Sequence, residues 1–201
     1  MKINKILLLS ILTLGTTLSA SRAEGFYVGA GFGSSNTDNS SISEELNNNL
    51  FDSKIISNST GFRFYGGYQI NEIAGFEFDY TNFGEFGIKN KDTGRLYGYN
   101  PESQSISVNL GHDLFNNQFR PFVKLGVGVI NLNSQELFEK DKNLNLHFSA
   151  GVQWSPKELK GVGFRVEYSS DNSKSKLNSR NLEQEHLQSI NLVTFGVQYS
   201  F

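Results

Sequence analysis

The chain has 201 residues, of which 37% are hydrophobic and 19% charged, and it contains 20 glycines and no cysteine. This length suits a single all-β domain, and the lack of cysteine excludes thiolate metal sites, thiol catalysis and a disulfide framework. A mean hydropathy of −0.36 excludes a bundle of transmembrane helices. It does not exclude a membrane β-barrel, because the lumen-facing half and the loops of such a barrel are polar.

Residues 1–23 predict a cleaved secretory signal peptide. A basic start, Met1–Lys5, precedes the apolar run Ile6–Leu14, and Ser21-Arg22-Ala23 offers a cleavage site, with cleavage after Ala20 as an alternative. The run is much shorter than the roughly 20 residues of a membrane-spanning helix. Cleavage after Ala23 leaves a domain at 24–201 with 15 basic and 20 acidic residues, a net charge of −5. That sign argues against nucleic acid as a partner.

From residue 24 onward, apolar and polar residues alternate with period two, the pattern of half-buried strands. Eight such segments are long enough to cross a membrane as tilted strands of about 9–11 residues. They are Phe26–Ser34, Thr60–Ile70, Ile73–Phe83, Ser103–Leu114, Phe122–Asn131, Leu144–Trp154, Val162–Ser170 and Val193–Phe201.

The connections between these segments alternate between short and long. The short ones are Asn71-Glu72, the stretch around Asn116-Asn117-Gln118, and Ser155–Gly161, where Ser155-Pro156-Lys157-Glu158 predicts one helical turn. The long polar ones are Ser35–Ser59, Gly84–Glu102, Leu132–Asn143 and Asp171–Leu187, and Ile42–Phe51 predicts a short helix in the first. We therefore predict an all-β fold, an eight-stranded antiparallel up-and-down transmembrane barrel with four long external loops and short periplasmic turns.

The two faces of the segments decide which side of the barrel meets lipid. One face carries almost only aromatic and aliphatic residues, whereas the other carries small residues and six charged ones: Arg63, Glu77, Asp79, Lys124, Arg165 and Glu167. Eight strands enclose a lumen just wide enough for side chains, so bulky residues on every strand would overfill it. The apolar face is expected to point outward into lipid, with Tyr68, Tyr80, Trp154, Tyr168 and Tyr199 in aromatic girdles.

Three of the six inward charges are positive and three are negative. Because an unpaired buried charge costs several kcal/mol, equal numbers predict a paired network that plugs the lumen. The functional alternative is that these residues line an ion pathway.

Three sequence stretches resemble the OmpA-type outer-membrane β-barrel family. They are Arg165-Val166-Glu167-Tyr168, Pro121–Gly128 and the terminal Phe195–Phe201. The resemblance implies a barrel in the outer membrane of a Gram-negative bacterium, with ion pairs in its lumen. It also implies that the alternating end, Phe195, Val197, Tyr199 and Phe201, is the signal that the barrel-assembly machinery recognises. The chain stops at Phe201, so the peptidoglycan-binding domain of full-length OmpA, and cell-wall anchoring with it, is not expected.

Catalytic, metal and cofactor chemistry have little support. His147-Phe148-Ser149 resembles the His-x-Ser pair of lipid A deacylases, but the alternation turns both side chains into the lumen, and Ala150-Gly151 departs from that family. His112, His147 and His186 have no cysteine or carboxylate at metal-ligand spacing. The glycines of Gly29–Gly33 lie in a strand pattern with no following helix, so they do not predict a phosphate loop. They are expected to make room for large neighbours such as Tyr65.

The function predicted from these patterns is a structural and surface-interaction role carried by the extracellular loops, without catalysis. The expected partners are outer-membrane lipids and lipopolysaccharide, the assembly machinery and periplasmic chaperones, and host or phage surface ligands. The alternatives are a narrow porin-like channel, a lipid A-modifying membrane enzyme and a soluble periplasmic binding barrel.

Overall fold

The structure, a computed structural model, describes residues 24–38, 53–56, 58–90, 96–133, 142–176 and 185–201. The predicted signal peptide and the predicted helix Ile42–Phe51 both lie outside these residues. None of the helices in the described part is long and apolar enough to span a membrane.

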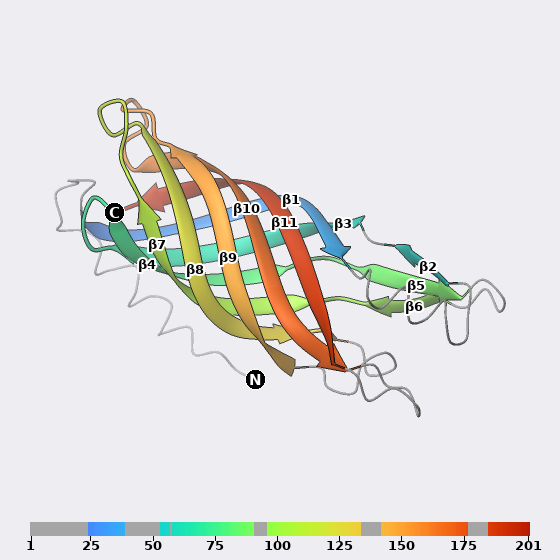
Figure 1. The fold of residues 1–201 in the computed structure, drawn as a ribbon. Helices are drawn as coiled ribbons and strands as arrows, with labels where there is room; N and C mark the ends of the chain where they lie inside the picture. Colours follow the sequence, from blue (N-terminus) through green and yellow to red (C-terminus); the bar gives the residue numbers. More distant parts are fainter. Residues whose placement is uncertain (1–23, 39–52, 57, 91–95, 134–141, 177–184) are drawn as a thin grey trace, which may run out of the picture.

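Eight strands form one closed antiparallel barrel (Figure 1). In chain order they are β1 (Gly25–Asp38), β3 (Asn58–Gln69), β4 (Ala74–Asn82), β7 (Glu102–Gly111), β8 (Phe119–Asn131), β9 (Lys142–Trp154), β10 (Val162–Lys176) and β11 (Glu185–Ser200). Each strand pairs with its neighbours in the chain, and β1 closes the barrel by pairing with β11, with Phe32 opposite Phe195. The predicted up-and-down barrel is therefore confirmed.

The orientation of the two faces follows the predicted alternation. Phe78, Val127 and Phe195 point outward with exposed fractions of 51%, 58% and 51%, whereas the polar partners on the same strands are buried. Had these three side chains packed together at the centre, the membrane interpretation would have been wrong. A continuous exposed apolar wall around a polar interior is stable only in lipid.

Several strands extend further than their apolar–polar alternation. β10 runs to Lys176 and β11 begins at Glu185, so both enter the segment Asp171–Leu187 that we expected to be a loop. Asp171 still pairs with Ile190, and Asn172 with Ser189. The inward positions Asp171 and Ser173 are still buried, so backbone pairing continues where the residues on both faces are polar and the apolar–polar pattern ends.

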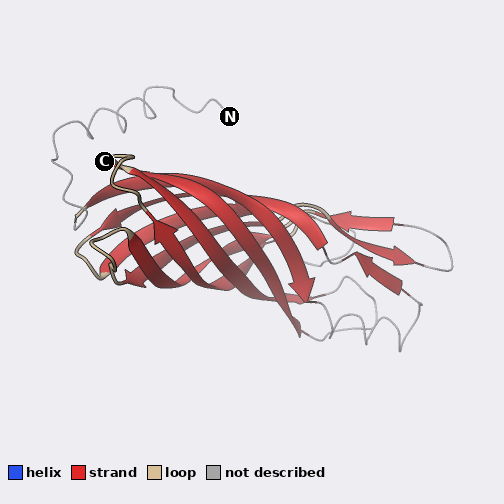
Figure 2. Cartoon of the chain, turned by 90° about the horizontal axis from the view of Figure 1, so that it is seen from above, coloured by secondary structure: helices blue, strands red, loops and turns tan. Residues whose placement is uncertain are grey.

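A second, three-stranded sheet was not predicted. It consists of β2 (Ser53–Ile56), β5 (Phe86–Asn90) and β6 (Leu96–Tyr99) in the order β2-β5-β6. It projects from the end of the barrel opposite the short turns (Figure 2). Its strands have only four or five residues, too few to show a clear period in the sequence.

The short turns have specific geometry. Asn71 Oδ1 accepts hydrogen bonds from the backbone N–H groups of Ile73 and Ala74, which holds the β3–β4 turn. Phe115, Asn116 and Asn117 have φ values of 52°, 55° and 64° in the β7–β8 turn. The helical turn predicted at 155–158 was wrong: a hydrogen-bonded turn forms there, with Leu159 N–H donating to Pro156 O, because only a few residues separate two paired strands.

Candidate functional site: the barrel lumen

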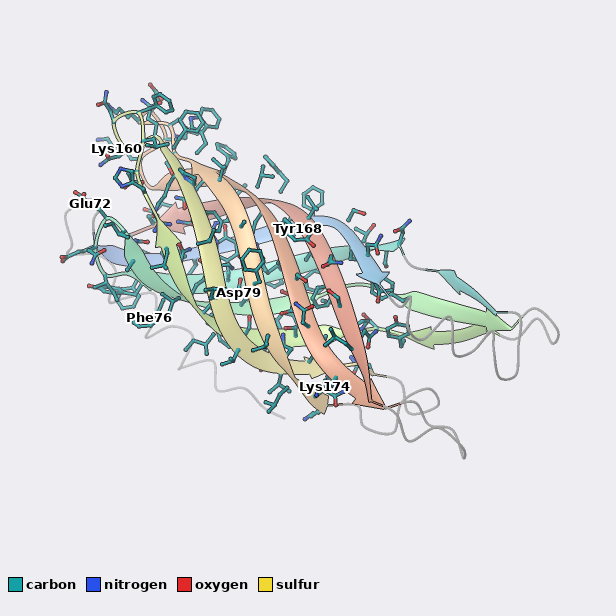
Figure 3. The ribbon with its side chains drawn as sticks, viewed as in Figure 1. Glu72, Phe76, Asp79, Lys160, Tyr168 and Lys174 are labelled. Atoms are coloured by element: carbon teal, nitrogen blue, oxygen red, sulfur yellow. The ribbon has the colours of Figure 1, made fainter. Side chains whose placement is uncertain are left out.

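The six charged residues predicted for the lumen all lie inside the barrel and are buried. They come from four strands: Arg63 from β3, Glu77 and Asp79 from β4, Lys124 from β8, and Arg165 and Glu167 from β10. Alternate residues of one strand face the same side, so β4 and β10 each contribute two inward groups. Asp79, labelled in Figure 3, lies within the barrel wall near its middle.

Lys124 lies at the centre of the cluster. Its Nζ is 2.6 Å from Glu77 Oε1, 2.9 Å from Asp79 Oδ1 and 2.8 Å from Glu167 Oε1. An ammonium group has three N–H donors. Here each of them has a carboxylate within reach, so Lys124 joins acidic side chains of β4 and β10 across the lumen.

Two arginines connect the same carboxylates from the other side. Arg63 Nη1 donates to Glu167 Oε1 at 2.8 Å, and Arg63 Nη2 contacts Glu167 Oε2. Arg165 Nη1 donates to both oxygens of Glu77, at 2.9 and 3.0 Å. The six residues therefore form one connected network with equal numbers of each charge, the arrangement that makes burial of ions tolerable.

Several other residues surround this network, and two of them, Arg120 and Asp171, were missed by sequence reasoning. Tyr27 donates from its hydroxyl to Glu77 Oε2 at 2.6 Å, and the guanidinium of Arg165 lies 4.2 Å from the centre of the Tyr65 ring. Arg120 and Asp171 are also buried in the lumen. They were missed because they fall just outside the predicted segments Phe122–Asn131 and Val162–Ser170. Gly29 faces the Tyr65 ring, which a Cβ at that position would overlap.

His147 and Ser149 face the lumen without contacting each other. His147 Nδ1 is 2.8 Å from Asp171 Oδ1, which also accepts a 2.6 Å hydrogen bond from Asn145. His147 Nε2 and Ser149 Oγ have no hydrogen-bond partner within the part of the chain described. In this geometry His147 pairs with Asp171 and does not hydrogen-bond to Ser149, the contact by which a histidine activates a serine.

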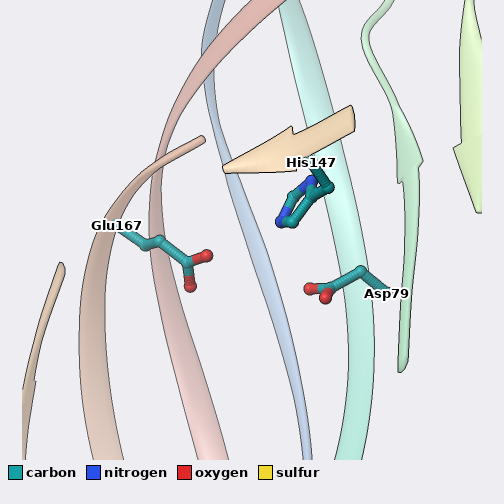
Figure 4. Close-up of side chains that lie close together, drawn as sticks. All are labelled: Asp79, His147 and Glu167. Atoms are coloured by element: carbon teal, nitrogen blue, oxygen red, sulfur yellow. The ribbon is translucent and has the colours of Figure 1, made fainter. Parts of the chain in front are cut away.

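Asp79, His147 and Glu167 have ligand atoms within 4.8 Å of one another (Figure 4). That spacing could suit a metal ion, but both carboxylates already contact Lys124 and Arg63. A divalent ion would therefore have to displace or approach these cations, and we interpret Lys124 as the cation that the carboxylates bind. Of the other histidines, His112 is exposed, and the side chain of His186 lies outside the described residues.

The loop end of the barrel contains an apolar cluster that was not predicted. Its members are Phe83, Phe86, Tyr99, Ile130, Leu132, Ile190 and Leu192, and all are almost completely buried. Ile130 and Leu192 occupy inward positions of β8 and β11, where a purely polar interior was expected. The lumen is thus filled by ions in its middle and by hydrocarbon groups at its loop end.

The terminal residues form the last outward positions of β11. Phe195, Val197 and Tyr199 are exposed on the outer face, and the Phe201 N–H donates to Phe26 O at 2.9 Å across the seam with β1. Their role as an assembly signal stays a prediction.

These features define an outer-membrane β-barrel of eight strands with an ionic lumen. The chain matches the family described as "Outer membrane protein beta-barrel domain" over residues 6–201, and it belongs to that family. It is accordingly a protein of the outer membrane. A comparison with curated proteins found no match.

Solved structures of similar fold are outer-membrane proteins. Neisserial surface protein A is 19% identical, with a TM-score of 0.56 over 88% of this chain and 97% of that one. OprG of Pseudomonas aeruginosa is 12% identical, with a TM-score of 0.57 over 89% and 96%. Ail of Yersinia pestis, in complex with the heparin analogue sucrose octasulfate, is 16% identical, with a TM-score of 0.51 over 89% and 99%. At these identities the likeness establishes the fold alone.

Proposed function

We propose that this protein is a closed outer-membrane barrel that presents its extracellular segments to surface ligands and does not conduct ions. The observation that carries the proposal is the double obstruction of the lumen. The ionic network connects β3, β4, β8 and β10 across the middle, and the apolar cluster fills the loop end. No catalysis is part of the proposal.

The extracellular side has the features of a contact surface. The strands β10 and β11 continue as a paired ribbon beyond the alternating region, and the β2-β5-β6 sheet projects from the same end (Figure 1). These paired strands extend away from the membrane, where host, phage or lipopolysaccharide ligands can reach them.

The Ail structure was solved with a heparin analogue, which is a polyanion. The first long segment of this chain, 38–57, contains Asp38, Glu44, Glu45 and Asp52 but only one basic residue, Lys54. Its negative charge disfavours a polyanion on that segment, so we propose a neutral or cationic ligand there.

Conductance separates the closed barrel from the porin-like alternative. Protein purified from outer membranes and inserted into planar bilayers is expected to give no steady current. A double variant, Lys124→Ala with Leu192→Ser, weakens both obstructions and is expected to raise the current. Ala30→Ser, on the lipid face of β1, serves as the control and should behave like the unaltered protein. Steady conductance of the unaltered protein would contradict the proposal.

Ligand contact requires a separate measurement. Cells that display the protein are expected to bind a host-cell monolayer or phage, and replacing residues 39–52 with a Gly-Ser linker should reduce that binding at equal surface amount. The same replacement at residues 134–141 is the matched control. Equal binding by the unaltered protein and both replacement variants would show that the first long segment is not the contact region.

A further inference from the structure

The barrel interior opens at the short-turn end into a cavity of about 670 Å³. Its wall includes residues of the β9–β10 turn, namely Ser155, Pro156, Lys157, Leu159, Lys160 and Gly161, and residues of the adjoining strand ends. Lys160, labelled in Figure 3, belongs to this wall, whereas Lys174 lies at the other end of the barrel. The volume falls within the roughly 300–1,000 Å³ of small-molecule sites, so the cavity can hold an organic molecule.

Arg120 is a buried cation in this wall, with an exposed fraction of 5%. Its Nη1 donates to Asn109 Oδ1 at 2.8 Å and its Nη2 to Ile73 O at 3.2 Å, and both acceptors are neutral. Its Nε has no hydrogen-bond partner. Arg120 also forms no ion pair with any residue in the described part of the chain. A buried charge with only neutral partners is costly, and here it faces an open cavity.

Other groups of the cavity favour an anion. Arg165 also lines it and is buried, and its Nε has no partner although its Nη1 binds Glu77. Lys157 and Lys160 add two positive charges from the β9–β10 turn. The acidic side chains in the lining are Glu24 and Asp113, against the four cationic ones, of which Arg165 is already paired with Glu77.

Asp113 supplies the competing explanation. One of its carboxylate oxygens, Oδ1, is buried without a partner, and Asp113 lies within electrostatic range of Arg120 but not within ion-pair distance. A water molecule between Asp113 and Arg120 would satisfy both groups without any ligand.

We propose that this cavity binds a small organic carboxylate from the periplasmic side. The carboxylate contacts the guanidinium of Arg120, whose planar donors match the geometry of two carboxylate oxygens. The apolar part of the ligand packs near Tyr27, Leu159 and Val162, which also line the cavity. This site is independent of the extracellular contact role, since it lies at the opposite end of the barrel.

Benzoate titration followed by NMR tests the proposal. In ¹⁵N-labelled protein purified from outer membranes, the Nε–H resonance of Arg120 is expected to shift saturably with benzoate. Benzyl alcohol, which keeps the ring and lacks the charge, should not shift it. No saturable shift with benzoate, or the same shift with both compounds, would overturn the proposal. The proposal would also be overturned if inorganic phosphate bound at this site and benzoate did not.

Variants locate the charge that binds. Arg120→Gln is expected to weaken benzoate binding about tenfold or more, the effect of a lost charge-assisted hydrogen bond. Lys174→Gln removes the same charge at the far end and should leave binding unchanged. Asp113→Asn keeps Arg120 and removes the competing carboxylate, so it should tighten benzoate binding several-fold. If Arg120→Gln does not fold, Asp113→Asn serves as the test. Unchanged affinity in Arg120→Gln, or in Asp113→Asn, would overturn the proposal, because benzoate would then bind without using the charge of Arg120.

Discussion

At the scale of single residues, Lys124 has the most consequential contacts in the lumen. Its ammonium reaches carboxylates of two strands, and all of these groups are buried. Removing one member of a buried ionic cluster leaves the others uncompensated, which costs about 3–5 kcal/mol, whereas an exposed ion pair contributes about 1 kcal/mol or less.

Lys124→Met is therefore expected to lower the free energy of unfolding by about 3–5 kcal/mol. Urea titration of the protein in lipid vesicles, read by the shift of the folded band on gels, measures the change. Lys174→Met, at an exposed lysine of β10, is the control and should change stability by less than about 1 kcal/mol. Adding Glu77→Gln to Lys124→Met restores charge balance and should recover part of the loss. Equal stability of the two single variants would refute a stabilising role for the network.

At the scale of the elements, the seam between β1 and β11 depends on close backbone approach. Gly33 pairs with Thr194, and a Cβ on Gly33 would overlap the backbone oxygen of Val193. A Cβ on Gly66 of β3 would meet only ordinary contacts, 3.6 Å from Tyr27 O and 3.7 Å from Val28 Cγ1. The close approach of β1 and β11 therefore requires a glycine at position 33, whereas position 66 has room for a Cβ.

Gly33→Ala is expected to destabilise the barrel by about 1–3 kcal/mol, the usual cost of inserting an atom where no space exists. Gly66→Ala should be neutral, or stabilising by up to about 1 kcal/mol, because alanine restricts the unfolded chain. The same urea titration compares the two proteins. A similar effect of both substitutions would contradict the close approach of the two strands at Gly33.

At the scale of the whole molecule, the outer surface is adapted to hydrocarbon. The exposed side chains of the barrel wall are predominantly apolar, and Trp154 and Phe164 stack on it with ring centres 5.6 Å apart. In a water-soluble protein, polar substitution of such exposed residues would change stability little.

Val127→Arg places a charge in the middle of this wall and is expected to cost about 2–4 kcal/mol in a bilayer. Phe115→Arg is the matched control, because Phe115 is exposed in the β7–β8 turn, outside the barrel wall. Refolding yield and urea titration in lipid vesicles measure both. Full stability of Val127→Arg would contradict the placement of this face in lipid.

The parts of the structure that could be predicted from the sequence are those that cross the membrane. There, lipid on one side and a narrow lumen on the other impose alternation, so Phe78 and Glu77 could be assigned to opposite faces from the sequence alone. Beyond the membrane, the outer face no longer has to be apolar and this constraint disappears. The extension of β10, and with it the inward position of Asp171, was missed because polar residues occupy both faces there, and the strands of the β2-β5-β6 sheet are too short to show a period. The alternation itself places Leu192 inward, next to outward Val193, but the apolar cluster was missed because the whole lumen was expected to be polar.

The pairing of β1 with β11 has a consequence for the time course of biogenesis. The partners of Tyr27–Asp38 lie at Ser189–Ser200, at the far end of the chain. Until that last stretch has left the ribosome and crossed the inner membrane, β1 lacks one of its two neighbours, and the cylinder cannot close. The barrel therefore cannot close before export of the chain is complete. Pairing of β1 with β11 is a late step of folding, and it closes the barrel.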